Sequence, residues 1–223
     1  MSTENASTGW VGTRVYEGDR TVRRLGELGL ELGLLRAAVV DGDEGRAACG
    51  PFHPIQSAGQ RMWSETTAGL RQRCMSRSRE WKLDRTNNLE TVVNTRLRVA
   101  IAVMGGDEFT GHRGAKLPRV RRKRGPATHA RVRQNRDWMP RLFEMPGDGD
   151  EDLDLSSLPV WLLLVRATDE ELYVELSLPT EVNASGYVTG WGERILLPKI
   201  PTTGGVTPIE EGDDDTGFAV VAK

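Results

Sequence analysis

The period of the hydrophobic residues changes along this chain, and the change constrains the fold more than any other feature of the sequence. Up to about residue 75, apolar side chains recur every three or four positions, which is the spacing of one face of an α-helix. From about residue 90 they alternate with polar or small residues, which is the period of a β-strand. We therefore predict an α+β protein in which N-terminal helices pack on one face of a mainly antiparallel sheet.

Two helices are predicted in the N-terminal part. The first runs from Asp19, a suitable N-cap residue, to about Val39. Glycines interrupt its apolar stripe, and because each costs about 1 kcal/mol relative to alanine, this helix depends on tertiary packing. Residues 41–55 are then expected to form a loop. The second helix begins at Ser57, in a capping-box sequence, and ends near Met75.

Alternating apolar residues predict two groups of strands, separated by an irregular segment. The first group is a hairpin whose longer strand is buried on one face only. The second group begins with a strand so apolar that we expect it to be buried on both faces. The expected strands are residues 91–93 and 97–103 in the first group, and residues 160–165, 172–178, 187–191 and 194–197 in the second.

Composition sets the remaining boundaries of the chain. We expect one α+β domain at residues 19–200, preceded by a disordered N-terminus at residues 1–18. Within the domain, residues 113–141 form a long basic insertion and residues 144–157 an acidic linker. Residues 201–223, which are rich in glycine, threonine and acidic side chains, are expected to form a disordered tail.

The formal net charge of -2 conceals a strong segregation of charge. Residues 113–141 hold 11 of the 30 basic residues and one of the 32 acidic residues, so their charge is +10 and that of the remainder is -12. Such a segment can contact several phosphates of a nucleic acid or another polyanion, independently of base sequence. A helix is predicted to begin within it at Pro126. The candidate contact residues are Arg119, Arg121, Arg122, Lys123, Arg124, Arg131, Arg133 and Arg136.

A second interpretation of the basic segment is self-neutralisation. Acidic residues follow it in the linker at residues 144–157 and again at residues 210–215, and either stretch can pair with the arginines. The segment contains one aromatic residue, Trp138, so it lacks the interleaved rings on which single-stranded bases stack.

A third interpretation is a metal-dependent hydrolase. Asp107 and Glu108 lie in a glycine-flanked loop after a predicted strand, and Glu175 on another strand is the third candidate ligand. No nuclease signature, phosphate-binding loop or dinucleotide fingerprint is present, and the three histidines are isolated. We therefore predict no cofactor and favour a non-catalytic binding protein over an enzyme.

The two cysteines and the absence of a membrane signal indicate a cytoplasmic protein. Cys49 and Cys74 are too few for a disulfide scaffold, and Cys74 lies on the apolar face of the second predicted helix, where we expect a buried filler. No apolar run is long enough to span a membrane. Another protein is the alternative partner, docked on apolar surface of the first helix.

Four stretches carry a resemblance to other proteins: residues 99–111 (VAIAVMGGDEFTG), 161–165 (WLLLV), 175–179 (ELSLP) and 193–198 (ERILLP). Together they resemble uncharacterised bacterial proteins associated with phage and integrative elements. The resemblance covers roughly a third of the chain and leaves out the basic run. Because no activity is established for that group, it implies a bacterial or phage setting and assigns no site residue.

Overall fold

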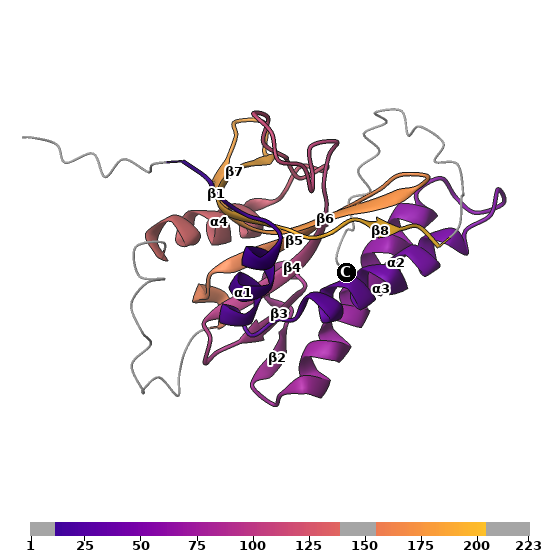
Figure 1. Cartoon of the computed structure of the whole chain (residues 1–223). Coiled ribbons are helices and arrows are strands. Elements are labelled where there is room, and N and C mark those ends of the chain that lie inside the picture. Colours follow the sequence, from indigo (N-terminus) through magenta and orange to yellow (C-terminus); the bar gives the residue numbers. More distant parts are fainter. Residues whose placement is uncertain (1–11, 139–154, 204–223) are drawn as a thin grey trace, which may run out of the picture.

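Eight strands form one mixed sheet in the computed structural model, which describes residues 12–138 and 155–203 (Figure 1). Their order is β1-β7-β6-β5-β4-β3-β2, and β8 pairs with β6 beside β7. The β1/β7 and β4/β5 pairs are parallel and all other pairs are antiparallel, which confirms the mainly antiparallel α+β prediction. The strands are β1 (Arg14–Tyr16), β2 (Trp81–Asp84), β3 (Thr91–Asn94), β4 (Val99–Gly105), β5 (Val160–Ala167), β6 (Glu171–Val182), β7 (Val188–Leu196) and β8 (Ile200–Pro201).

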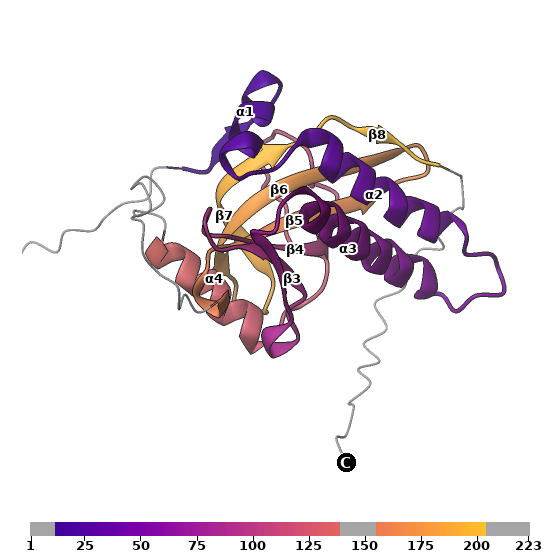
Figure 2. The same cartoon turned by 90° about the horizontal axis from the view of Figure 1, so that it is seen from below.

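Helices cover both faces of the sheet (Figures 1 and 2). The N-terminal helices α1 (Asp19–Glu27), α2 (Leu32–Ala47) and α3 (Ser57–Arg77) lie on one face, as predicted. Helix α4 (Pro126–Trp138) begins at the predicted proline but packs on the opposite face, against β5 and β6. No helix within residues 12–138 and 155–203 is both long and apolar enough to cross a membrane.

Strand alternation assigns each core side chain to one of these two faces. On β5, Trp161 and Leu163 pack with the N-terminal helices, whereas Leu162 and Leu164 pack on the α4 side. Strand β4 was predicted to be half-buried, yet Ala100 on its second face is also fully buried. The prediction was wrong because α4 and the loop before it cover that face. These segments are distant in sequence, so the alternation of residues within β4 does not indicate that its second face is buried.

The first predicted helix is two helices, broken at Gly29. This glycine has φ of 69°, a left-handed conformation that ends α1 and redirects the chain into α2. Helix α2 then continues to Ala47, through residues that we predicted to form a loop. The reason is close packing on α3: a Cβ at Gly42 would lie 2.0 Å from Thr66 Oγ1, so glycine permits the contact. Buried Asp43 also accepts a hydrogen bond from Thr203 N (2.7 Å).

The sequence pattern missed the short edge strands. Strand β1 lies inside the N-terminal stretch that was expected to be disordered, where it pairs in parallel with β7. Residues 187–191 and 194–197 were expected to form two strands, but they contribute to the single strand β7. The tail was expected to be disordered from residue 201, but Pro201 pairs with Glu171 and Thr203 N donates to Asp43 Oδ2. The rest of the disorder predictions, for residues 1–11 and 204–223, and residues 139–154 of the predicted insertion and linker lie outside the described residues.

Two glycine substitutions test the break between α1 and α2. Gly29→Ala should lower the free energy of unfolding by about 1–3 kcal/mol, because alanine is strained at positive φ. Gly33→Ala is the matched control, because this glycine lies in α2 with open space around its Cβ position. Alanine there should raise the free energy of unfolding by about 0.5 kcal/mol. Urea midpoints measure both; equal effects of the two substitutions would contradict the assigned role of Gly29.

Candidate nucleic-acid interface

Backbone hydrogen bonds fix the middle of the basic segment to two strands. Val120 forms an antiparallel bridge with Gly106, directly after β4, and Arg121 N donates to Gly105 O (2.9 Å). On its other side, Val120 N donates to Val188 O at the start of β7 (3.0 Å). We call residues 118–124 the basic link, because they join the end of β4 to the start of β7. The middle of the segment is therefore hydrogen-bonded to the sheet, although residues 113–125 form no helix or strand and Val120 is their one bridge residue.

Residues 118–121 of the basic link alternate between buried and exposed, as in a strand, whereas Arg122 and Lys123 are both exposed. Pro118 and Val120 are buried, and Val120 belongs to the core on the α4 side of the sheet. Trp191 Nε1 donates to Pro118 O (2.7 Å), which adds a side-chain anchor. Arg119 and Arg121 therefore point to solvent, because the apolar residues between them point to the core.

A buried ion pair holds the chain just before the basic link. Arg194 on β7 donates through Nε to Glu175 Oε1 on β6 (3.0 Å), and both side chains are at most 1% exposed. Glu175 Oε2 also accepts from Gly111 N (2.8 Å), while Arg194 Nη2 donates to His112 O (3.0 Å). Ser177 Oγ supplies a further hydrogen bond to Glu175 Oε1 (2.7 Å). The pair thus ties the loop after β4 onto the sheet.

Positive charges lie close together within the link. Burial, and then the neighbouring charge of Arg122, lower the pKa of the Arg124 guanidinium below its usual value. Arg124 Nε is buried without a hydrogen-bond partner, and the part of the chain that the structure describes supplies no carboxylate for it. An anionic ligand would relieve this repulsion.

Within the described residues, two basic side chains of the segment lie near carboxylates of the fold. Arg113 pairs with Glu17, and Arg119 Nε lies 3.7 Å from Asp107 Oδ2, beyond hydrogen-bond distance. The acidic stretches at residues 144–154 and 210–215 lie outside the described residues, so pairing with them stays a prediction.

The structure divides the predicted contact residues into surface and structural groups. On the link, Arg119, Arg121, Arg122 and Lys123 are exposed and Arg124 is partly buried; on α4, Arg133 and Arg136 are exposed. Arg131 is buried instead and donates to Leu155 O (3.0 Å), so its role is to fix α4 rather than to contact a ligand. Sequence reasoning missed Asn135, which bonds to Val160 and Pro179 backbone atoms and anchors α4 to the sheet.

The three candidate metal ligands do not form a site. Glu175 is occupied by the ion pair, and Asp107 Oδ1 accepts a hydrogen bond from Phe109 N (3.1 Å). Burial raises the pKa of the Asp107 carboxyl above its usual value. Within residues 12–138 and 155–203, no group of three or more histidine, cysteine, aspartate or glutamate side chains is arranged to hold a metal ion.

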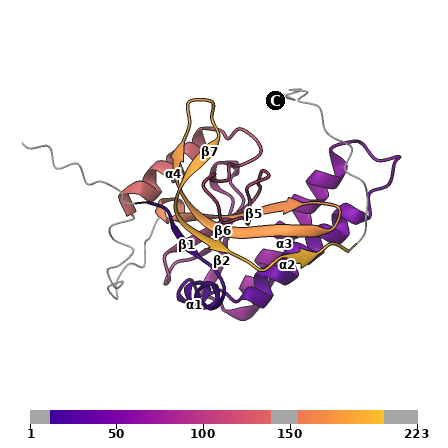
Figure 3. The same cartoon turned by 45° about the horizontal axis from the view of Figure 1, so that its top comes forward.

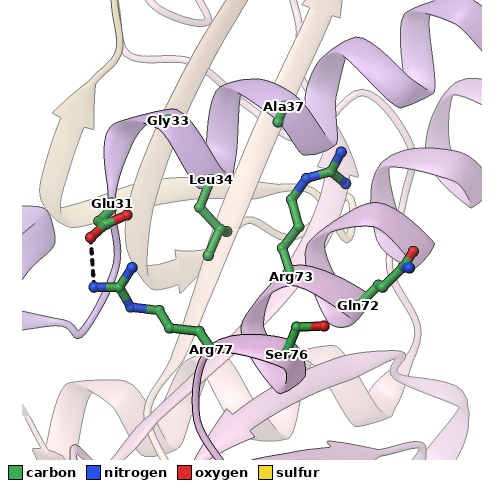
Figure 4. Close-up of a pocket in the computed structure, with 8 residues that line it drawn as sticks. All are labelled: Glu31, Gly33, Leu34, Ala37, Gln72, Arg73, Ser76 and Arg77. Carbon is green, nitrogen blue, oxygen red and sulfur yellow. Dashed lines mark ion pairs between the residues drawn. The ribbon is translucent and has the colours of Figure 1, made fainter.

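A surface groove of about 570 Å³ lies between α2 and α3 (Figure 4). Its charged side chains are already paired: Arg77 Nη2 lies 2.6 Å from a carboxylate oxygen of Glu31, and Arg73 binds Asp41 through both terminal nitrogens. Arg73 and Arg77 reach across from α3 toward α2 (Figure 4). The groove is therefore less suited than the basic link to bind a charged ligand. Its lining residues are Glu31, Gly33, Leu34, Ala37, Gln72, Arg73, Ser76 and Arg77.

Cys74 is buried, as expected from its place on the apolar face of α3. Burial raises the pKa of its thiol to about 12, so the nucleophilic thiolate is scarce at neutral pH. Cys49 is also free and buried. Both cysteines are therefore buried core residues.

No family model, curated protein or solved structure matches this chain. The function is therefore inferred from the geometry of the chain itself.

Loss of the buried Glu175–Arg194 pair should release the loop after β4 and the basic link from the sheet. Glu175→Gln should lower the free energy of unfolding by about 3–5 kcal/mol, because Arg194 is left as an uncompensated buried charge. Urea unfolding measures this loss, and trypsin should cleave the link of the variant faster than that of the wild type. The matched control is Glu80→Gln, which breaks the exposed Arg96–Glu80 pair and should cost less than about 1 kcal/mol. Similar losses in both variants would contradict the anchoring role.

Proposed function

We propose that this protein binds nucleic acid, or another polyanion, through the exposed basic side chains of the basic link. In this proposal it is a non-catalytic protein of a bacterial mobile element or phage and acts in the cytoplasm. One observation carries the proposal: the link holds five basic residues within residues 119–124 on a backbone that is bonded to two strands. A charged run on a fixed backbone presents its guanidinium groups without a large loss of backbone entropy on binding.

The electrostatics of the link favour an anionic partner. Burial and the neighbouring charge of Arg122 lower the pKa of partly buried Arg124, while the carboxylates of Asp107 and Glu17 lie near Arg119 and Arg113. A series of phosphates neutralises several such groups together and releases counterions from the nucleic acid. Affinity gained in this way depends steeply on salt and weakly on base sequence.

Neutralising the link tests the proposal. The triple variant Arg121→Gln, Arg122→Gln and Arg124→Gln should weaken binding uniformly over sequences and lower the salt slope by about 1 for each phosphate that the variant no longer neutralises. Fluorescence anisotropy with DNA, RNA and heparin across a salt series measures both quantities, and the heparin arm separates nucleic acid from other polyanions.

The matched control removes the same charge from the opposite side of the sheet. Arg36, Arg61 and Arg79 are exposed on or beside α2 and α3, and their triple replacement by glutamine should leave binding nearly unchanged. Equal losses from both triple variants, or no binding by the wild type at low salt, would contradict the proposal.

Binding to another protein is the second candidate function, and the α2–α3 connection favours it. Phe52 is 100% exposed and Ile55 is 65% exposed, in a turn that His53 N stabilises by donating to Gly50 O (3.0 Å). We expected the apolar docking surface on the first helix, where Val22 is 56% exposed but Leu25 is fully buried. The two most exposed of the large apolar side chains in the described residues lie instead at this tip, which projects from the end of the molecule opposite α4 (Figure 3).

Replacing the tip residues separates the two functions. Phe52→Ser with Ile55→Ser should abolish a nuclease-resistant complex with a protein partner. Nucleic-acid binding should be unchanged, because neither side chain is charged and neither belongs to the basic link. Affinity purification after nuclease treatment, with mass spectrometry of retained proteins, measures the first effect. Retention of the same proteins by wild type and variant would argue against this surface.

A further inference from the structure

Aromatic rings from outside the basic segment lie against its cations. The Arg119 guanidinium lies over the Tyr187 ring (4.9 Å to the ring centroid), and Lys116 Nζ lies over the Phe109 ring (5.2 Å). Tyr187 comes from the β6–β7 turn, 68 residues along the chain from Arg119. Within the segment the sequence shows one aromatic residue, Trp138, so this arrangement exists only in the folded chain.

Asp107 lies between a residue of each of these two ring–cation pairs. Its Oδ1 accepts from Phe109 N (3.1 Å), and its Oδ2 lies 3.7 Å from Arg119 Nε. Its backbone N also donates to Arg119 O (3.2 Å), so the two pairs are held on either side of one residue. The Arg119 side chain remains 53% exposed, because this carboxylate is too distant to bind it firmly.

A third ring, that of Tyr173, lies against the same loop after β4. Tyr173 on β6 lies 4.6 Å from the His112 ring at a tilt of 32°, and the Arg166 guanidinium lies 5.2 Å from its centroid. Arg166 Nη1 donates to Glu108 O (3.3 Å), in the same loop as Phe109. We call Phe109, Arg119, Tyr173 and Tyr187 the ring surface.

We infer that the polyanion bound by this protein is a single-stranded nucleic acid. Its bases stack on the ring surface while Arg121, Arg122 and Lys123 contact its phosphates. This inference rests on the proposed function and adds the class of ligand. In a duplex the base faces are covered by their neighbours, whereas a single strand exposes them to aromatic rings and to arginine planes. The stacked Arg119–Tyr187 pair offers both kinds of surface at one place.

Replacing Arg119 by lysine tests the stacking inference, because lysine keeps the positive charge of arginine but lacks the planar guanidinium group. Arg119→Lys and Tyr187→Ala should each weaken single-strand binding about tenfold, the typical effect of losing one stacked base. Duplex binding and the salt slope should change little, because Arg119→Lys keeps the positive charge at this position and Tyr187 is not a proposed phosphate contact. Anisotropy of a labelled oligothymidine, and of a duplex of equal length at the same salt concentration, measures both affinities.

The outcomes separate the inference from the proposed function. Tighter binding of the single strand, with a selective loss in both variants, supports stacking. Equal affinity for single strand and duplex, with no effect of Arg119→Lys, overturns the inference; if the link triple variant still weakens binding, the proposed function stands. No binding of either ligand at low salt overturns both. Urea midpoints identify any misfolding of Tyr187→Ala, in which case the exposed Arg119→Lys variant decides.

Discussion

The arrangement of the candidate site depends on the buried Glu175–Arg194 pair. Removing two charges from water is costly, and here the contact between the two side chains offsets part of that cost. Hydrogen bonds offset more of it: Gly111 N and Ser177 Oγ donate to Glu175, and Arg194 donates to His112 O. These groups are directional, so they specify one position of the loop after β4. Apolar contacts alone would allow that loop to shift along the sheet.

From this anchor the chain continues into the basic link, which forms backbone hydrogen bonds with the end of β4 and the start of β7. Val120 enters the core, and the arginines on either side of it are directed to solvent. The same residues therefore serve the fold and the surface. This dual role explains how a strongly basic stretch is held against the sheet: burial of Pro118 and Val120 stabilises a backbone whose charges repel one another.

Much of the fold could be predicted, because helical and strand periods are local properties. The β5–β6 hairpin, the start of α4 at Pro126 and the burial of Cys74 followed from patterns within a few residues. The break at Gly29 and the helical course of Asp41–Ala47 did not, because each depends on a contact with a distant segment. Helix propensities are small compared with the energies of tertiary packing, so the sequence alone is a poor guide to whether a glycine-rich stretch is helical.

The sequence by itself determined where the positive charge lies, since charge is a property of each residue. Only the tertiary structure decided which of those residues reach the surface: Arg131 is buried, whereas Arg119 and Arg121 are exposed. It also decided which groups surround them. Tyr187 lies against Arg119, and Glu175, a candidate metal ligand in the sequence, is an ion-pair partner in the fold. Such neighbours are set by strand pairing between distant segments, and no local period encodes that pairing.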